Sequence, residues 1–148
     1  QNNYCFGRWM IYFYGIGSSG IAALMAEDFF LHVGKACKAV NDSHLQRVQS
    51  AIRGTKDIIV TISLNGAAMN YIKPQTAKEN GSTIIAKLSD CALQTKGFES
   101  IVTGETFILV ISQLYVLDLL YTAFMSSVDQ KQTFDYQQKI AKSLLRNR

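Results

Sequence analysis

Short apolar runs alternate with longer segments of helical periodicity through most of the chain. Strands are predicted at residues 11–14, 35–40, 57–63, 82–86 and 92–95. Helices are predicted at residues 19–33, 43–53, 67–80, 107–128 and 129–145. Strands that alternate with helices are typical of a parallel sheet whose two faces are both covered. The pattern therefore predicts an α/β fold.

Local signals mark where several of these helices begin and end. Gly34 follows the first helix at the position that a C-terminal glycine prefers. Ser43 has Gln46 three residues later, which predicts a capping box at the start of the second helix, and Gly54 ends that helix.

The junction between the fourth and fifth predicted strands is too short for a parallel crossover. Only residues 87–91 lie between them, whereas such a connection needs a dozen or more residues. Either the fifth strand pairs differently, or a loop is missing from the sequence near Ala86 and Lys87. We favour the missing loop.

The most apolar segment, residues 106–128, is long enough to cross a bilayer. Gln113 and Asp118 lie in its middle, and a central aspartate costs about 2.5–3.5 kcal/mol on insertion scales. We expect no membrane span here, but a helix buried in the domain or in a subunit interface.

Composition and charge narrow the class of protein. The 148 residues fit one domain, and a net charge of +4 is too small to indicate nucleic-acid binding by this domain itself. Cys5, Cys37 and Cys91 are widely spaced and odd in number, so we expect no disulfide framework, no metal site and a cytoplasmic location. The start at Gln1 suggests part of a longer protein.

Two glycine-rich, serine-bearing turns each follow a predicted strand. They are Gly15–Gly20 and Ser63–Gly66. A turn that leads into a helix offers free N–H groups and the positive end of the helix dipole, which together bind anions. Both turns could contact one phosphorylated ligand, because ligands of open parallel sheets bind at the carboxyl ends of neighbouring strands. The predicted ligand-binding residues are Gly17, Ser18, Ser19, Asp42, Ser63, Leu64, Asn65 and Gly66.

A dinucleotide site is an alternative for the first turn. Gly15, Gly17 and Gly20 match the dinucleotide fingerprint, and Asp42 follows the second strand where a ribose-binding acid is expected. This alternative leaves the second turn unexplained, and Asp42 could instead simply cap a helix. No set of nucleophile, base and orienting acid can be identified, and Glu105 is the one acid near the start of the long helix.

The chain resembles the sugar isomerase (SIS) domain, and more closely the effector half of RpiR-type bacterial transcriptional regulators. The resemblance is carried by residues 11–20, 32–35, 41–46 and 57–63 and extends over nearly the whole chain, residues 1–148. It implies a three-layer α/β/α sandwich around a five-stranded parallel sheet, usually dimeric, that binds a sugar phosphate or amino-sugar phosphate. It also implies an N-terminal helix-turn-helix domain, absent from these residues, through which alone the protein contacts DNA.

The phosphate loop departs from the family pattern Ser-x-Ser-Gly-x-Thr. Asn65 replaces a serine and keeps a donor, whereas Ala68 replaces the threonine and removes one, worth about 1.5–3 kcal/mol. Asn70 stands where isomerases of the family often carry an acid. We therefore expect a sensor without catalytic residues or cofactor, and a sugar-phosphate isomerase is the alternative.

Overall fold

The computed structural model describes residues 9–63, 89–93, 107–128 and 130–145. Three strands in these residues form a parallel sheet in the order β2-β1-β3. They are β1 (Ile11–Tyr14), β2 (Cys37–Val40) and β3 (Ile58–Thr61). The helices are α1 (Ser18–His32), α2 (Ser43–Ile52), α4 (Phe107–Ser127) and α5 (Gln130–Leu145). The predicted α/β class is confirmed.

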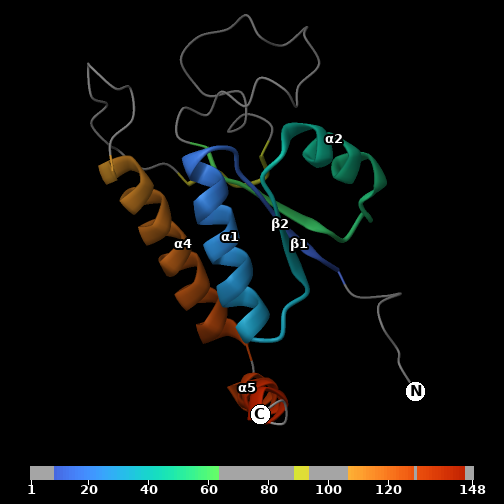
Figure 1. Ribbon diagram of the computed structural model, residues 1–148, viewed down its shortest axis with the longest axis vertical. Helices are drawn as coiled ribbons and strands as arrows, with labels where there is room; N and C mark the ends of the chain where they lie inside the picture. The colour runs from blue at the N-terminus through green and yellow to red at the C-terminus, as the bar shows by residue number, and fades with distance from the viewer. Residues whose placement is uncertain (1–8, 64–88, 94–106, 129, 146–148) are drawn as a thin grey trace, which may run out of the picture.

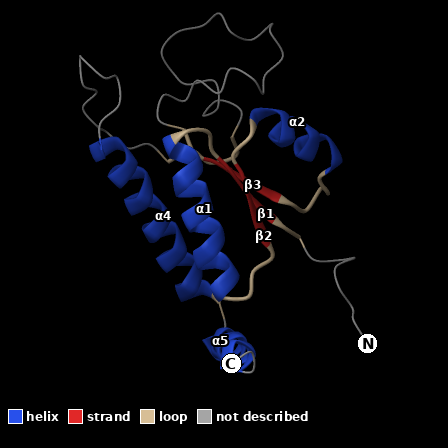
Figure 2. Ribbon diagram, in the orientation of Figure 1, coloured by secondary structure: helices blue, strands red, loops and turns tan. Residues whose placement is uncertain are grey.

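Helices cover both faces of this sheet. Figures 1 and 2 show α1 and α4 side by side on one face and α2 on the other. All four residues of β1 are buried, as expected for a central strand between two helical layers. Phe13 is fully buried, and its ring centroid lies 5.3 Å from that of Phe30 on α1. The small residues Ala22, Ala23 and Ala26 allow α1 to pack closely on the sheet.

The end of α1 is a Schellman motif. The Gly34 N–H donates to Leu31 O at 2.9 Å, and the Lys35 N–H donates to Phe30 O at 3.0 Å. Gly34 has a φ of 77°, which favours glycine. A Cβ on Gly34 would also lie 2.6 Å from the ring of Tyr136, so α5 docks directly over this glycine. The predicted role of Gly34 is confirmed.

A side chain of α1 accepts a hydrogen bond from a backbone N–H at the outer edge of β2. The Ala39 N–H donates to Glu27 Oε2 at 2.9 Å, and Lys38 Nζ lies 3.9 Å from Glu27 Oε1. Because β2 has β1 as its one neighbour among the described strands, Glu27 occupies a backbone donor that could otherwise pair with another strand.

The capping box predicted at the start of α2 is wrong. Asp42 is the N-cap residue, and its Oδ1 accepts a hydrogen bond from the Leu45 N–H at 2.8 Å. Gln46 does not reach back to the helix start, because it is only 1% exposed and binds elsewhere.

The remaining predictions for the second half of the chain have mixed outcomes. The long apolar helix and the amphipathic helix after it are confirmed as α4 and α5. The third helix, the fourth strand and the junction at Ala86 and Lys87 lie outside the described residues. Ala92 and Leu93 are exposed and belong to no strand, so the first half of the predicted fifth strand is wrong.

The long helix α4 is less buried than we expected. By length and composition it could cross a membrane. Only 17% of its most apolar 18-residue stretch is buried in this chain. One side packs on α1, where Leu117 joins the core cluster and the ring of Tyr121 lies against Phe30. The expectation of a helix packed within the domain therefore holds for one side of α4 only.

Candidate functional site

The turn between β1 and α1 brings the backbone into close contact with the first turn of the helix. A Cβ on Gly15 would lie 2.2 Å from the backbone oxygen of Ser19, so only glycine fits there. Gly17 is the N-cap residue with a φ of 61°, and no side chain caps the helix. The first turn of α1 carries no acidic side chain, which leaves its positive dipole end available to an external anion.

Gln46 holds this turn in place from the opposite face of the sheet. Its Nε2 donates to Gly15 O at 3.3 Å and also to Val40 O. The Gly15 N–H in turn donates to Val40 O at 3.4 Å. The amide thus joins the first glycine turn to the end of β2. Sequence reasoning assigned Gln46 to a helix cap and missed this role.

Ser19 faces α4 rather than solvent. It is 4% exposed, and Gln113 Nε2 donates to its Oγ at 3.0 Å. Gln113 is itself 8% exposed, which explains why a polar residue occurs in the middle of the apolar helix α4. Of the predicted contacts in this turn, Gly17 is exposed and Ser18 is half-buried, so both lie closer to solvent than Ser19.

The carboxyl ends of β1 and β3 lie side by side, as the sequence predicted. Tyr14 is opposite Thr61, and the Ile62 N–H donates to Tyr14 O at 2.7 Å. Ser63 follows directly and is exposed. Since β1 has β2 on its other side, this is the point at which the strand order reverses. Leu64, Asn65 and Gly66 lie outside the described residues.

Asp42 lies at the same edge of the sheet, after β2. It is exposed, and capping α2 accounts for one of its carboxylate oxygens. His44, in the first turn of α2, is exposed as well. The structure therefore supports the interpretation of Asp42 as a helix cap and leaves the predicted ligand contact as a proposal.

Two kinds of chemistry, metal binding and thiol attack, can be examined in the described residues. No cluster of His, Cys, Asp and Glu that could hold a metal ion occurs in the part of the chain that the structure describes. Burial, reinforced by the charge of Glu27, raises the pKa of the Cys37 thiol to about 11. Cys37 is therefore a protonated thiol at neutral pH and a poor nucleophile. Glu105 and Asn70 lie outside the described residues.

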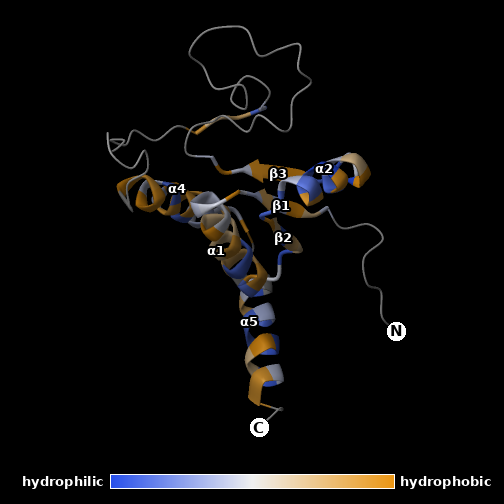
Figure 3. Ribbon diagram, turned by 45° about the horizontal axis from the view of Figure 1, so that its top comes forward, coloured by the Kyte–Doolittle hydropathy of each residue, from blue (hydrophilic) through white to orange (hydrophobic). Residues whose placement is uncertain are grey.

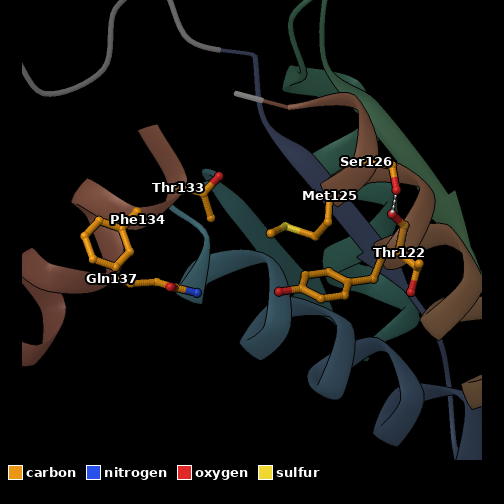
Figure 4. Close-up of a pocket in the computed structure, with 7 residues that line it drawn as sticks. Thr122, Met125, Ser126, Thr133, Phe134 and Gln137 are labelled. Carbon is orange, nitrogen blue, oxygen red and sulfur yellow. Dashed lines mark hydrogen bonds between the residues drawn. The ribbon is translucent and has the colours of Figure 1, made fainter. Parts of the chain in front are cut away.

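A pocket lies between α4 and α5 (Figure 4). It is open to solvent and has a volume of about 390 Å³. Its lining residues are Tyr121, Thr122, Met125, Ser126, Thr133, Phe134 and Gln137. None of these lining residues is charged, so the pocket offers a phosphate no cationic side chain.

The chain is similar to bacterial proteins named HTH-type transcriptional regulators. An uncharacterized regulator of this name from Clostridium perfringens is 37% identical in an alignment that covers 82% of this chain and 49% of the relative. A second, from Caldanaerobacter subterraneus, is 32% identical and covers 74% of this chain and 43% of the relative. The chain thus spans about half the length of these relatives. No protein-family model matches it.

The chain is also similar to one part of a longer protein. A protein named bifunctional protein glk from Burkholderia orbicola is 30% identical over 77% of this chain, but that region is only 19% of its own length.

Proposed function

We propose that this chain is a phosphosugar-sensing effector domain of a bacterial transcriptional regulator, which binds a sugar phosphate or amino-sugar phosphate without turning it over. One observation supports this most strongly. The N-terminus of α1, which no side chain caps, and Ser63 both follow strands that end at the same carboxyl edge of the sheet, where the strand order reverses. The similarity to HTH-type regulators supports the regulatory half of the proposal.

The proposed site has a phosphate end and a sugar end. The phosphate accepts hydrogen bonds from the first turn of α1, from Gly17 to Ser19, and from the hydroxyls of Ser18 and Ser63. Ser19 contributes through its N–H, because its hydroxyl is engaged with Gln113. The sequence predicts that Leu64, Asn65 and Gly66, which follow Ser63, also contact the phosphate. Asp42, which follows β2, would bind a sugar hydroxyl.

The proposed regulation follows from the architecture of the relatives. This chain spans about half of each, and a helix-turn-helix domain in the remainder would contact DNA in the cytoplasm. The regulator would act as a homodimer, so that a ligand favouring one arrangement of the two effector domains changes the spacing of the DNA-binding domains. Neither a cofactor nor a membrane takes part in this mechanism.

Thermal unfolding of this chain against a ligand panel tests the proposal. The panel contains sugar phosphates, amino-sugar phosphates, the unphosphorylated sugars and nicotinamide dinucleotides. A ligand at 100 times its Kd adds about 2.7 kcal/mol to the free energy of unfolding, which raises Tm by about 5–10 °C. We expect one class of phosphosugar to do so, and its unphosphorylated sugar to have no effect.

Two variants locate the binding. Ser63→Ala should abolish the stabilisation by the phosphosugar, whereas the control Ser143→Ala, on the exposed side of α5, should retain it. Stabilisation by a nicotinamide dinucleotide alone, lost in Asp42→Ala, would replace the proposal by the dinucleotide alternative. Turnover of the stabilising phosphosugar would identify an isomerase.

A further inference from the structure

Gln113 is a buried polar residue in an apolar helix. Helix α4 is hydrophobic over most of its length (Figure 3), and Gln113 is 8% exposed. A side-chain amide has two N–H donors and an oxygen that can accept two hydrogen bonds. Among the described residues, Ser19 is the one partner of this amide. Because an apolar side chain of the same size would avoid the cost of burying an amide, the glutamine needs an explanation beyond packing.

The contact joins α4 to the first turn of α1. Gln113 Nε2 donates to Ser19 Oγ at 3.0 Å, and Ser19 Oγ lies 3.4 Å from Gln113 Oε1. Ser19 is 4% exposed and lies directly after the first residue of α1. The two helices run side by side on one face of the sheet (Figure 1). The hydrogen bond therefore fixes the start of α1 against a helix from the second half of the chain.

This hydrogen bond holds a helix end that no side chain caps. Gly17 is the N-cap residue of α1 and offers no side-chain acceptor. Helix ends fray unless something holds them. A capping side chain would itself accept hydrogen bonds from N–H groups of the first turn, which are the groups that the proposed phosphate site uses. Gln113 binds a hydroxyl instead, and so holds the turn without occupying a backbone N–H.

A second buried amide holds the other end of the same segment. Gln46, on α2 and the opposite face of the sheet, donates from Nε2 to Gly15 O at 3.3 Å. The segment from Gly15 to Ser19 is thus held at both ends, once from each helical layer. A ligand that finds its donors already in place loses less conformational entropy on binding. Both amides therefore favour binding of an anion to this segment.

We propose that Gln113 is a positioning residue for the phosphate end of the site. Its hydrogen bond to Ser19 holds the N–H groups of the first turn of α1 where a phosphate accepts from them. This role rests on the proposed function and deepens it, because it couples the site to α4. By linkage, a bound phosphate stabilises the contact between α1 and α4 by the same factor by which that contact raises the affinity for phosphate. Occupancy of the site is thereby transmitted to α4.

A double-mutant cycle with inorganic phosphate tests this role. The Kd of phosphate is measured by isothermal titration calorimetry of the 148-residue chain, at constant ionic strength and at a temperature at which circular dichroism shows every variant folded. Gln113→Met nearly keeps the side-chain volume, and Ser19→Ala keeps the backbone N–H. We expect each single variant to raise Kd about tenfold. The double variant should raise Kd no further, because both substitutions remove the same hydrogen bond.

Two controls separate positioning from stability. Gln138→Met, on the exposed side of α5, should bind phosphate as the wild type does. Each single variant leaves one buried polar group without its partner, so Tm should fall, whereas the double variant removes both groups and should regain most of the wild-type Tm. A double variant that still binds phosphate about tenfold more weakly supports positioning. A double variant that recovers the wild-type Kd would show that the hydrogen bond acts through stability alone, and would overturn the proposal.

Hydrogen exchange tests the coupling from the side of α4. Saturating inorganic phosphate should slow amide exchange around Gln113 in the wild type and leave it unchanged in the double variant. Exchange in α4 that does not respond to phosphate in the wild type would contradict the coupling.

The remaining outcomes are distinguishable from failure of the sensor function. A chain that a phosphosugar stabilises, but that binds no inorganic phosphate or binds it equally well as Gln113→Met, would keep the sensor function and lose the role of Gln113. Losses that multiply to about a hundredfold in the double variant would assign the Ser19 hydroxyl its own contact with phosphate, and would also overturn the proposal. A wild type that binds neither phosphate nor any phosphosugar of the panel would overturn the proposed function and this role together.

Discussion

Replacing Gln46 by methionine removes the buried amide that holds the glycine turn while keeping nearly the same side-chain volume. Two hydrogen bonds are lost, one to Gly15 O and one to Val40 O. Val40 O keeps the Gly15 N–H as a donor, whereas Gly15 O loses the only side-chain donor that reaches it among the described residues. The loss therefore leaves one buried carbonyl without a partner.

The magnitude follows from these two contacts. A neutral hydrogen bond contributes about 0.5–1.5 kcal/mol, and a buried carbonyl without a donor costs about 1–3 kcal/mol. We expect Gln46→Met to lower the free energy of unfolding by about 2–4 kcal/mol, and Tm by roughly 5–15 °C. Urea denaturation measures the change directly, with an unchanged m-value.

A matched control separates the buried site from the general effect of the substitution. Gln138→Met, on the exposed side of α5, should change stability by less than about 0.5 kcal/mol. If Gln46→Met were as stable as Gln138→Met, the amide would not hold the turn, and the account of the glycine turn given above would be wrong.

A glutamate at the same position adds a pH dependence with a definite sign. In Gln46→Glu, burial and the two facing carbonyls favour the protonated acid, so its folded pKa lies above the unfolded value of about 4.3. The stability of this variant relative to Gln46→Met should be greatest below that unfolded pKa and fall as pH rises through the folded pKa. Equal pH profiles for the two variants would contradict this.

Four further substitutions or measurements test other parts of the structure. Asp42→Ala should cost about 1 kcal/mol in urea denaturation, because it removes the N-cap, whereas Ser43→Ala should cost little; the reverse order would restore the capping box. Gly34→Ala should lower Tm, because it forces a positive φ on alanine and places a Cβ against the aromatic ring of α5, and an unchanged Tm would show that α5 does not dock there. Native Cys37, with a pKa near 11, should resist alkylation at pH 8 while exposed Cys91 reacts, as mass spectrometry can show. Relative to Cys37→Ala, the wild type should lose stability as pH rises from about 9 towards 11, because its folded thiol pKa is raised, and a flat difference would refute the buried thiol.

Most of the local structure followed from the sequence because its signals are short-range. The strand at Ile11–Tyr14 is a run of β-branched and aromatic residues that ends at a glycine turn. The glycine at position 34 marks the end of α1, because a left-handed residue is needed there. The adjacency of the first and third strands also followed, from the general rule for open parallel sheets.

The errors and omissions arose where contacts are long-range. The sequence of α2 places apolar residues at positions 45, 48 and 52, which are all exposed, while the polar Gln46 is the buried residue of that helix. Helix periodicity does not reveal that a glutamine is needed inside, because the need comes from two carbonyls on other elements. Gln113 is a similar case, since its partner Ser19 lies 94 residues away.

The sequence by itself determined the order of strands and helices, the glycine turn at the end of β1 and the apolar character of α4. These depend on backbone preferences and on the periodicity of neighbouring residues. Only the tertiary structure decided that Ser19 points to α4, that Gln46 holds the turn, and that α4 and α5 expose apolar sides. Each of these depends on which surfaces meet after folding, and burial is a property of the assembled elements rather than of any one segment.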